Sequence, residues 1–301
     1  MKYLLSLVLL FSLVAYGQTA EEYLERGITK SLHQDYRSAI SDYNKAIELD
    51  PKDAGAYYNR GQAKYGLQAY TGAISDYTKS IELDPKDADA YFTRGQAKYG
   101  LQDYTGAISD FSKAIELDPK DAWAYYNRGQ AKYVLQDYTN AISDYTKSIE
   151  LDPKDAGAYF TRGQAKSKLQ RYRGAISDYS KAIELDPKDA WAYYNRANAK
   201  KKLQDYRGAI SDYTKAIELD PKDAWAYNNR GIAKEKLQDY RGAFSDYSRA
   251  IELDPKDGDA YYNRGIAKIK LGQKDSGCLD LSKAGQLGHE NAYDAIRDLC
   301  N

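Results

Sequence analysis

Small, apolar and charged positions recur along the chain with the spacing of amphipathic helices. In one stretch, Ala56 and Arg60 lie four residues apart and therefore share a face of one helix. A second stretch of the same kind follows and ends at Pro85, because proline cannot continue a helix. The pattern predicts one helix from about Ala56 to Leu67 and another from about Tyr70 to just before Pro85.

This pair of helices repeats every 34 residues. All seven prolines stand in the string Glu-Leu-Asp-Pro-Lys-Asp and are separated by 34 residues: Pro51, Pro85, Pro119, Pro153, Pro187, Pro221 and Pro255. The repeats are expected to start at Ala20, Ala54, Ala88, Ala122, Ala156, Ala190, Ala224 and Gly258. Such a period predicts an all-α, right-handed α-solenoid of about eight helix-turn-helix repeats, which bury their apolar faces against one another.

The carboxyl-terminal end departs from the repeat. The eighth unit lacks the closing proline, and an amphipathic segment over residues 290–301 is expected to be a capping helix for the solenoid, residues 18–289. The two cysteines of the chain, Cys278 and Cys300, both lie in this region. They either pack as small apolar residues or form a disulfide that fastens the cap, and we expect the disulfide.

Residues 1–17 have the character of a secretory signal peptide. Met1-Lys2 is followed by an apolar run that ends in Ala15-Tyr16-Gly17, a small-residue cleavage pattern. The run is too short for a permanent transmembrane anchor, so cleavage before Gln18 is expected to leave no integral membrane span. This pattern predicts export to the periplasm, the cell envelope or the extracellular space.

The repeat unit carries the features of a known family. The string Ala-Gly-Ala-Tyr-Tyr-Asn-Arg-Gly-Gln-Ala-Lys begins at Ala54 and is followed by Tyr70, Ala73, Tyr77 and, at the end of the unit, a proline. This unit resembles the tetratricopeptide repeat, with seven full matches and one partial match over residues 20–289. The resemblance implies a non-enzymatic protein-interaction scaffold, and it implies that one stripe of each first helix lines the concave, ligand-holding surface.

We number each repeat from its first residue, so that Ala54 is at position 1; the stripe then comprises positions 2, 5, 9 and 12 of the first helix. On this stripe the repeats differ, and aromatic side chains alternate with amides. The candidate binding residues are Tyr58, Gln62, Tyr65, Phe92, Gln96, Tyr99, Trp123, Tyr126, Gln130, Tyr133, Phe160, Gln164, Trp191, Tyr194, Asn198, Lys201, Trp225 and Asn228. All three tryptophans of the protein are among them.

Aromatic rings with amides between them suit an extended peptide, which is the expected ligand. Some Tyr and Phe rings could instead pack against the neighbouring repeat. Two other functions remain open, because aromatic rings also stack on the sugar rings of a cell-envelope glycan, and near-identical arrays can self-assemble. The Lys, Asn and Arg set with which some tetratricopeptide proteins clamp a terminal carboxylate is incomplete here.

Charged residues also recur inside the array. An arginine of each first helix, such as Arg60, is expected to pair with the aspartate of the second helix, here Asp76, because it lies on a closely packed face of small residues. Anion binding by these arginines in the groove is the alternative. The recurrent lysine, here Lys64, is expected to lie along apolar surface with its amine in water. Repeats two to four carry 12 basic and 15 acidic residues, whereas repeats five and six carry 14 and 9.

The composition points away from other functions. The 44 basic and 44 acidic residues cancel, which argues against a nucleic-acid ligand. The only histidines, His33 and His289, lie near opposite ends, and no cluster has the spacing of metal ligands or of a catalytic site. We therefore expect no metal, no cofactor and no catalysis, and a monomer that binds a protein or peptide partner.

Overall fold

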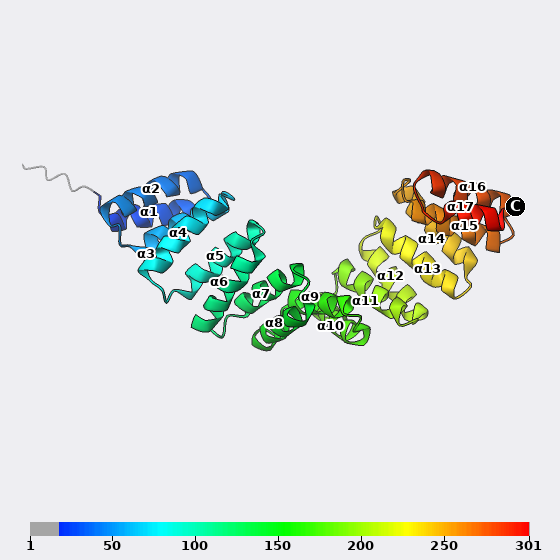
Figure 1. Ribbon diagram of the computed structural model, residues 1–301, viewed down its shortest axis with the longest axis horizontal. Coiled ribbons are helices and arrows are strands. Elements are labelled where there is room, and N and C mark those ends of the chain that lie inside the picture. The colour runs from blue at the N-terminus through cyan, green and yellow to red at the C-terminus, as the bar shows by residue number, and fades with distance from the viewer. Residues whose placement is uncertain (1–17, 301) are drawn as a thin grey trace, which may run out of the picture. The chain divides into compact units, whose positions relative to one another are not determined.

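The computed structural model describes residues 18–300, and it is helical throughout, with no strand in that range. The predicted signal peptide lies outside the described residues. The chain divides at Pro119 into two compact units, which are considered separately. In each unit, paired helices follow one another in chain order (Figure 1). No helix among the described residues is both long and apolar enough to span a membrane.

Unit 1 holds the first three repeats. Its helices are α1 (Ala20–Leu32), α2 (Tyr36–Leu49), α3 (Ala54–Gly66), α4 (Tyr70–Leu83), α5 (Ala88–Gly100) and α6 (Tyr104–Leu117). Unit 2 holds the other five repeats and a last short helix. Its helices are α7 (Ala122–Val134), α8 (Tyr138–Leu151), α9 (Ala156–Lys168), α10 (Tyr172–Leu185), α11 (Ala190–Lys202), α12 (Tyr206–Leu219), α13 (Ala224–Lys236), α14 (Tyr240–Leu253), α15 (Gly258–Lys270), α16 (Lys274–Gln286) and α17 (Ala292–Leu299).

The helix boundaries follow from capping. The Asp53 carboxylate accepts a hydrogen bond from the Ala56 N–H at 3.1 Å, and α3 begins at Ala54, two residues earlier than expected. The Asp103 carboxylate accepts from the Gly106 N–H at 2.9 Å at the start of α6. These bonds satisfy amide groups that have no partner inside the helix. The predicted all-α fold of helix-turn-helix repeats is confirmed.

The turn between the two helices of a repeat contains a backbone conformation that the sequence pattern does not predict. At position 15, seven repeats place a glutamine in the left-handed region, with φ between 58° and 63°. The eighth repeat has Gly272 there, with φ of 80°. Glycine adopts this conformation without steric cost, whereas a side chain makes it less favourable. The turn is therefore set by hydrogen bonds such as the one from the Ala69 N–H to the Lys64 carbonyl, 2.9 Å long.

The core of each unit consists of a large ring between small residues. Tyr77 of α4 is 1% exposed and packs between Ala73 of its own helix and Ala97 of the following repeat. Tyr145 of α8 is related in the same way to Ala165 of α9. Each ring thus joins two successive repeats, which is how a solenoid without a central core is stabilised.

The predicted pairing of arginine with aspartate is present in every repeat. In the fifth repeat, the Arg162 guanidinium donates two hydrogen bonds to the Asp178 carboxylate, of 3.0 and 2.8 Å. A third donor of Arg162 reaches Thr146 of the preceding repeat at 3.1 Å, and the guanidinium lies 5.6 Å from the Tyr159 ring centroid. The arginine therefore connects two repeats, and it is occupied by structural contacts rather than directed to a ligand.

The prediction for the recurrent lysines was wrong. Their amines do not point into water, because each forms an ion pair with the aspartate that the arginine also binds; Lys166, for example, lies 2.7 Å from Asp178. The Asp178 side chain is 4% exposed. If Arg162 were its only partner, part of this buried carboxylate would have no hydrogen-bond donor, which is unfavourable away from water. The same pair forms at Lys30, Lys64, Lys98, Lys132, Lys166, Lys200, Lys234 and Lys268.

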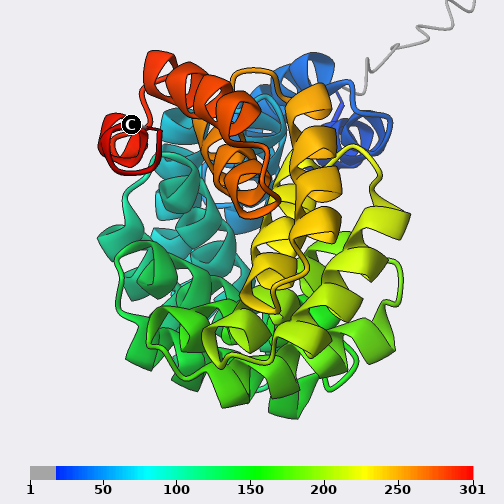
Figure 2. The same ribbon diagram turned by 90° about the vertical axis from the view of Figure 1, so that its right-hand side faces the viewer.

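The last helix packs against the end of unit 2. Helix α17 contacts α16 and is coloured red in Figure 2. Ala292 and Ala295 are its buried residues. A disulfide joins Cys278 of α16 to Cys300, which follows α17, and the two Cα atoms are 5.9 Å apart. The apolar face of the last repeat is thus covered by an element that is also covalently attached.

One buried hydroxyl allows a test of this packing. Ser80 of α4 is 1% exposed, and its hydroxyl has no hydrogen-bond partner among the described residues, whereas Ala114 stands at the same position of the next repeat. We expect Ser80→Ala to raise the free energy of unfolding by about 1 kcal/mol, because it removes an unsatisfied buried polar group. The reverse change, Ala114→Ser, is expected to lower it by a similar amount. Urea unfolding measures both, and destabilisation by Ser80→Ala would contradict the packing described.

Candidate functional site

The candidate binding residues lie on the first helices of both units. In unit 1 they come from α3 and α5, namely Tyr58, Gln62, Tyr65, Phe92, Gln96 and Tyr99. In unit 2 they come from α7, α9, α11 and α13, namely Trp123, Tyr126, Gln130, Tyr133, Phe160, Gln164, Trp191, Tyr194, Asn198, Lys201, Trp225 and Asn228. Each unit therefore presents its own stretch of the stripe.

The three tryptophans are the most exposed aromatic residues of the stripe. Trp123, Trp191 and Trp225 are 62%, 61% and 67% exposed. Their backbone is nevertheless fixed, because each follows directly on the first residue of a helix; the Asp121 carboxylate, for example, accepts from the Trp123 N–H at 2.8 Å. These indole rings are thus held in place by a rigid element while most of their surface faces solvent.

Two of the indoles rest on a neighbouring tyrosine. The rings of Trp123 and Tyr126 are 5.9 Å apart and those of Trp191 and Tyr194 are 5.6 Å apart, both in edge-to-face arrangements. Such contacts are favourable and restrict the indole without covering it. The tryptophans are therefore partly oriented before any ligand is present.

The Tyr and Phe residues at position 5 are half-buried, and they pack on the second helix of their own repeat rather than only on the neighbouring one. Tyr58 lies 5.8 Å from the buried Tyr77 ring of its second helix, and Phe160 lies 5.8 Å from Tyr179. Burial raises the pKa of Tyr58 and raises that of Tyr179 to about 12. These rings are therefore partly accessible to a ligand, and they form the floor of the stripe.

The amides at position 9 are tied to this floor. The Gln62 amide donates to the Tyr58 hydroxyl at 2.5 Å, and the Gln130 amide donates to the Tyr126 hydroxyl at 2.8 Å. Since the amide nitrogen is used in this way, the carbonyl oxygen of each glutamine remains to accept a hydrogen bond. A backbone N–H of an extended chain is a suitable donor.

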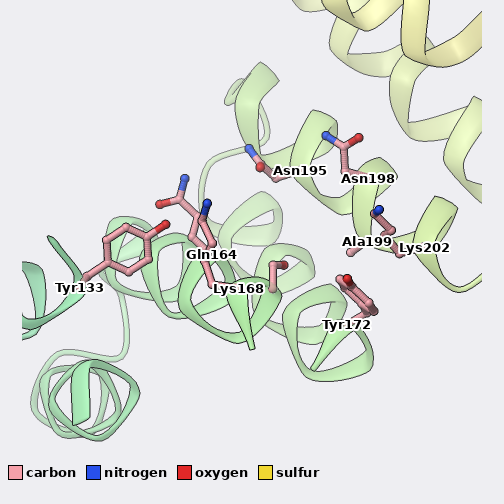
Figure 3. Close-up of a pocket in the computed structure, with 9 residues that line it drawn as sticks. Tyr133, Gln164, Lys168, Tyr172, Asn195, Asn198, Ala199 and Lys202 are labelled. Carbon is pink, nitrogen blue, oxygen red and sulfur yellow. The ribbon is translucent and has the colours of Figure 1, made fainter. Parts of the chain in front are cut away.

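Two cavities of the stripe lie where position 12 holds a small residue. Tyr65, in the second repeat, fills this position and packs edge-to-face on Tyr70 with ring centroids 5.3 Å apart. The fifth repeat has Ser167 instead, and a cavity of about 380 Å³ opens there in unit 2 (Figure 3). The first repeat has Ser31, and a cavity of about 500 Å³ opens in unit 1. Loss of a phenol ring at a packed position leaves a space of this kind.

The cavity in unit 2 includes residues that are not among the candidate binding residues. Alongside the predicted Tyr133, Gln164 and Asn198, it is lined by Ser167, Lys168, Tyr172, Asn195, Ala199 and Lys202. Figure 3 shows that they come from the first helices of three successive repeats and from the start of α10. The available signal was the exchange of tyrosine for serine at position 12, because that exchange removes volume from one place on an otherwise repeating face.

Lys201 fills position 12 of the sixth repeat with a partly buried ammonium group. Its amine donates to the Asn229 carbonyl oxygen at 2.5 Å, and the Asn229 amide in turn donates to the Tyr194 hydroxyl at 3.2 Å. Burial, and to a smaller extent the charge of Lys202, lowers the pKa of Lys201 to about 8. A cation is therefore held in the stripe by neutral groups.

This shift predicts a pH dependence of stability. The pKa of Lys201 is about 8 in the folded protein, against roughly 10.4 for an unfolded lysine. Between these values the unfolded state binds more protons, so the destabilisation by Lys201 is fully present below pH 8 and is relieved as the pH rises. We expect Lys201→Met to stabilise the protein by roughly 1 kcal/mol at pH 7, after allowance for solvent screening. The gain should shrink between pH 8 and pH 10.

Urea unfolding of both proteins across this pH range measures the effect. The exposed Lys222 provides the control, since Lys222→Met should change stability equally at every pH. The difference between wild type and Lys201→Met, rather than either value alone, is the relevant quantity, because the buried tyrosines also titrate at high pH. A difference that stays constant from pH 7 to pH 10 would show that Lys201 has an ordinary pKa.

Comparison with known families gives a consistent result. Three family models, described as TPR repeat or tetratricopeptide repeat, together match residues 33–278. Their matches are 33–68, 65–102, 95–136 and 163–204 for the first, 122–155, 190–223 and 224–257 for the second, and 144–177 and 247–278 for the third. No curated protein sequence matches the chain.

Several solved structures are similar to the chain. YrrB, described as a TPR protein with an unusual peptide-binding site, is 25% identical with a TM-score of 0.56, over 62% of this chain and 97% of that one. The protein MamA is 25% identical with a TM-score of 0.54, over 57% and 94%. The C-terminal part of a TPR repeat-containing protein from Cytophaga hutchinsonii is 21% identical with a TM-score of 0.71, over 80% and 98%, and shows the fold alone.

Proposed function

The chain belongs to the tetratricopeptide repeat family, whose fold is that of a protein-interaction scaffold. We propose that it is a non-enzymatic protein and that it binds an extended peptide segment of a partner along the stripe. The observation that carries this proposal is the exposure of three indole rings at the same position of three first helices of unit 2, α7, α11 and α13, at 62%, 61% and 67%. Tryptophan is highly buried on average in proteins, so three exposed indoles at the same position of one stripe favour a surface that contacts a partner.

The chemistry of the stripe favours a peptide. Tryptophan is enriched among the residues that contribute most to protein interfaces, and it loses little conformational entropy on binding. Trp123 and Trp191 are already restrained by ring contacts, so binding should order them little further. On α7, the helix that carries Trp123, the Gln130 carbonyl can accept from a peptide N–H. The half-buried rings of position 5 complete an apolar floor beneath an extended chain.

The relatives support the class of function without identifying the ligand. YrrB, which is described as having a peptide-binding site, aligns over 97% of its own chain. That resemblance makes a peptide ligand a reasonable proposal for this chain, and the exposed tryptophans specify where it would bind. The partner protein is left to experiment.

Selection from a display library of random 12-residue peptides tests the proposal on residues 18–301. We expect enriched peptides whose binding is lost on the variant Trp123→Ala/Trp191→Ala/Trp225→Ala. The matched control replaces three exposed leucines of unit 2 that lie off the stripe, Leu135, Leu203 and Leu237, by alanine, and it should bind as the wild type does. Circular dichroism checks that each variant is folded.

Two outcomes would overturn the proposal. The first is a folded, monomeric protein that enriches no peptide. The second is a set of peptides that bind the triple tryptophan variant as tightly as the wild type, because that would place the binding surface elsewhere.

We also propose that the protein is exported. Support comes from the signal-like sequence of residues 1–17 and from the disulfide between Cys278 and Cys300, a bond that persists in oxidising compartments. Expression in a bacterial host and sequencing of the amino terminus test this, and the expected mature protein begins at Gln18. A protein that stays in the cytoplasm with Met1 intact would contradict export.

A further inference from the structure

The cavity of unit 2 beside Ser167, here termed the Ser167 pocket, differs chemically from the rest of the stripe. Its lining contains two lysines and three amides, and no carboxylate. The lining residues are Tyr133, Gln164, Ser167, Lys168, Tyr172, Asn195, Asn198, Ala199 and Lys202. Most of the polar groups there can donate hydrogen bonds, so the pocket is suited to an acceptor, and an anionic one in particular.

The two lysines of the pocket are not used by the fold. The recurrent lysines next to them in sequence, Lys166 and Lys200, are each 2.7 Å from a buried aspartate. Within residues 18–300, neither Lys168 nor Lys202 forms such an ion pair. Both occupy position 13 of a first helix. Of the three repeats that surround the pocket, the fifth and sixth have a lysine at this position, and the fourth has Val134. Both lysines are exposed, both line the same cavity, and neither forms an ion pair with a carboxylate within residues 18–300.

A third lysine adds to the positive potential nearby. Lys201 precedes Lys202, and its ammonium is held by the neutral Asn229 amide. Lys202 is the next residue of α11, and its positive charge contributes to the lowered pKa of Lys201. A bound anion would relieve the repulsion between these two positive charges.

The Asn198 amide is oriented so that it can donate. Its carbonyl oxygen accepts a hydrogen bond from the Tyr213 hydroxyl at 2.7 Å, so its NH₂ group, which also bonds to the Tyr194 hydroxyl, has an N–H left to donate to a ligand. Asn195 lies one helical turn after the exposed Trp191 and donates to the Trp191 carbonyl at 2.8 Å. The pocket is therefore adjacent to one of the proposed tryptophan anchors.

We propose that the Ser167 pocket binds the carboxylate side chain of an aspartate or glutamate in the bound peptide, with Lys168 and Lys202 as the paired cations. This inference rests on the proposed peptide-binding function and adds a sequence requirement to it. The acidic residue would lie next to the part of the peptide that contacts Trp191. The pocket, of about 380 Å³, is large enough for a side chain of this size.

The test uses the same display library on three proteins. On the wild type, enriched peptides are expected to share an acidic residue at one position. On Lys168→Gln/Lys202→Gln that preference should disappear, while selection for aromatic or apolar residues persists. The control Lys188→Gln/Lys222→Gln removes the same two charges from exposed sites outside the pocket and should keep the preference.

The affinity of one selected peptide gives the quantitative result. Replacing its acidic residue by the corresponding amide should weaken binding to the wild type by about 10- to 100-fold, as expected for loss of a charge-assisted hydrogen bond. The same replacement should have little effect on binding to the double lysine variant. An equal loss on both proteins would overturn the proposal.

A second variant tests the pocket without changing any charge. Ser167→Tyr restores the residue that fills position 12 in repeats two to four, so the fold should accept it, and the ring should occupy the pocket. The acidic preference is expected to be lost. If peptides are enriched but show no acidic preference on the wild type, the pocket proposal fails while the proposed function stands. If no peptide is enriched, the proposed function itself fails.

Discussion

Replacing Asp178 by alanine is expected to lower the free energy of unfolding by about 3–5 kcal/mol. The Asp178 carboxylate is 4% exposed and is bound by both Arg162 and Lys166. Its removal leaves two positive charges on a largely buried face, with side chains 15% and 21% exposed. The free-energy cost of keeping these unpaired charges away from water is then larger than the stabilisation that repacking around the alanine methyl group could provide.

Urea unfolding followed by circular dichroism measures this effect. Glu184, on the outer side of the same second helix, offers a matched control because its ion pair with Lys181 is 2.6 Å long but exposed. Glu184→Gln should change stability by no more than about 0.5 kcal/mol. If Asp178→Ala costs less than 1 kcal/mol, the ion network is not what stabilises the helix pair, and the recurrent lysines and arginines would need another explanation.

The second large effect is expected at the carboxyl-terminal end. The disulfide between Cys278 and Cys300 spans 22 residues, and a closed loop of that length is worth about 3 kcal/mol. Helix α17 has only eight residues, too few to be stable without its packing on α16. In Cys278→Ala/Cys300→Ala, amide hydrogens of α17 should therefore exchange about 100-fold faster, while α7 to α14 keep their protection.

Hydrogen exchange with mass spectrometry resolves this local change. The variant Asp294→Ala/Arg297→Ala is the control, since it removes an exposed ion pair from α17 and should leave its protection nearly unchanged. A thiol assay on the unfolded wild type, without reductant, should find no free cysteine. Two free thiols in that assay, or unaltered exchange in the cysteine variant, would contradict the role given to the disulfide.

Much of this structure follows from the repeating pattern. Pro85 and its equivalents end the second helix of the first seven repeats, and aspartates such as Asp53 begin the next helix, so these helix boundaries are encoded locally. The pairing of Arg60 with Asp76 was also predictable, because a charge on a face of alanines requires a partner. The positions of the tryptophans on first helices follow from the same register.

Other features depend on three-dimensional contacts that no local pattern reports. The pairing of Lys64 with Asp76 was missed because a long side chain on a surface helix usually reaches water, and only the distance between the helices brings the amine to the carboxylate. The left-handed conformation of Gln68 was missed because glycine is the usual residue there. The Ser167 pocket was missed because a cavity depends on what the neighbouring repeats fail to fill.

The most direct test of the central claim uses the tryptophans themselves. The protein has three, all on the stripe, so tryptophan fluorescence, excited at a wavelength that its tyrosines do not absorb, reports on the proposed binding surface alone. Titration with a selected peptide that contains no tryptophan should shift the emission to shorter wavelength in a saturable manner, because a bound chain removes exposed indole rings from water. A peptide that binds by calorimetry but leaves the emission unchanged would show that the ligand lies elsewhere and would contradict the proposed function.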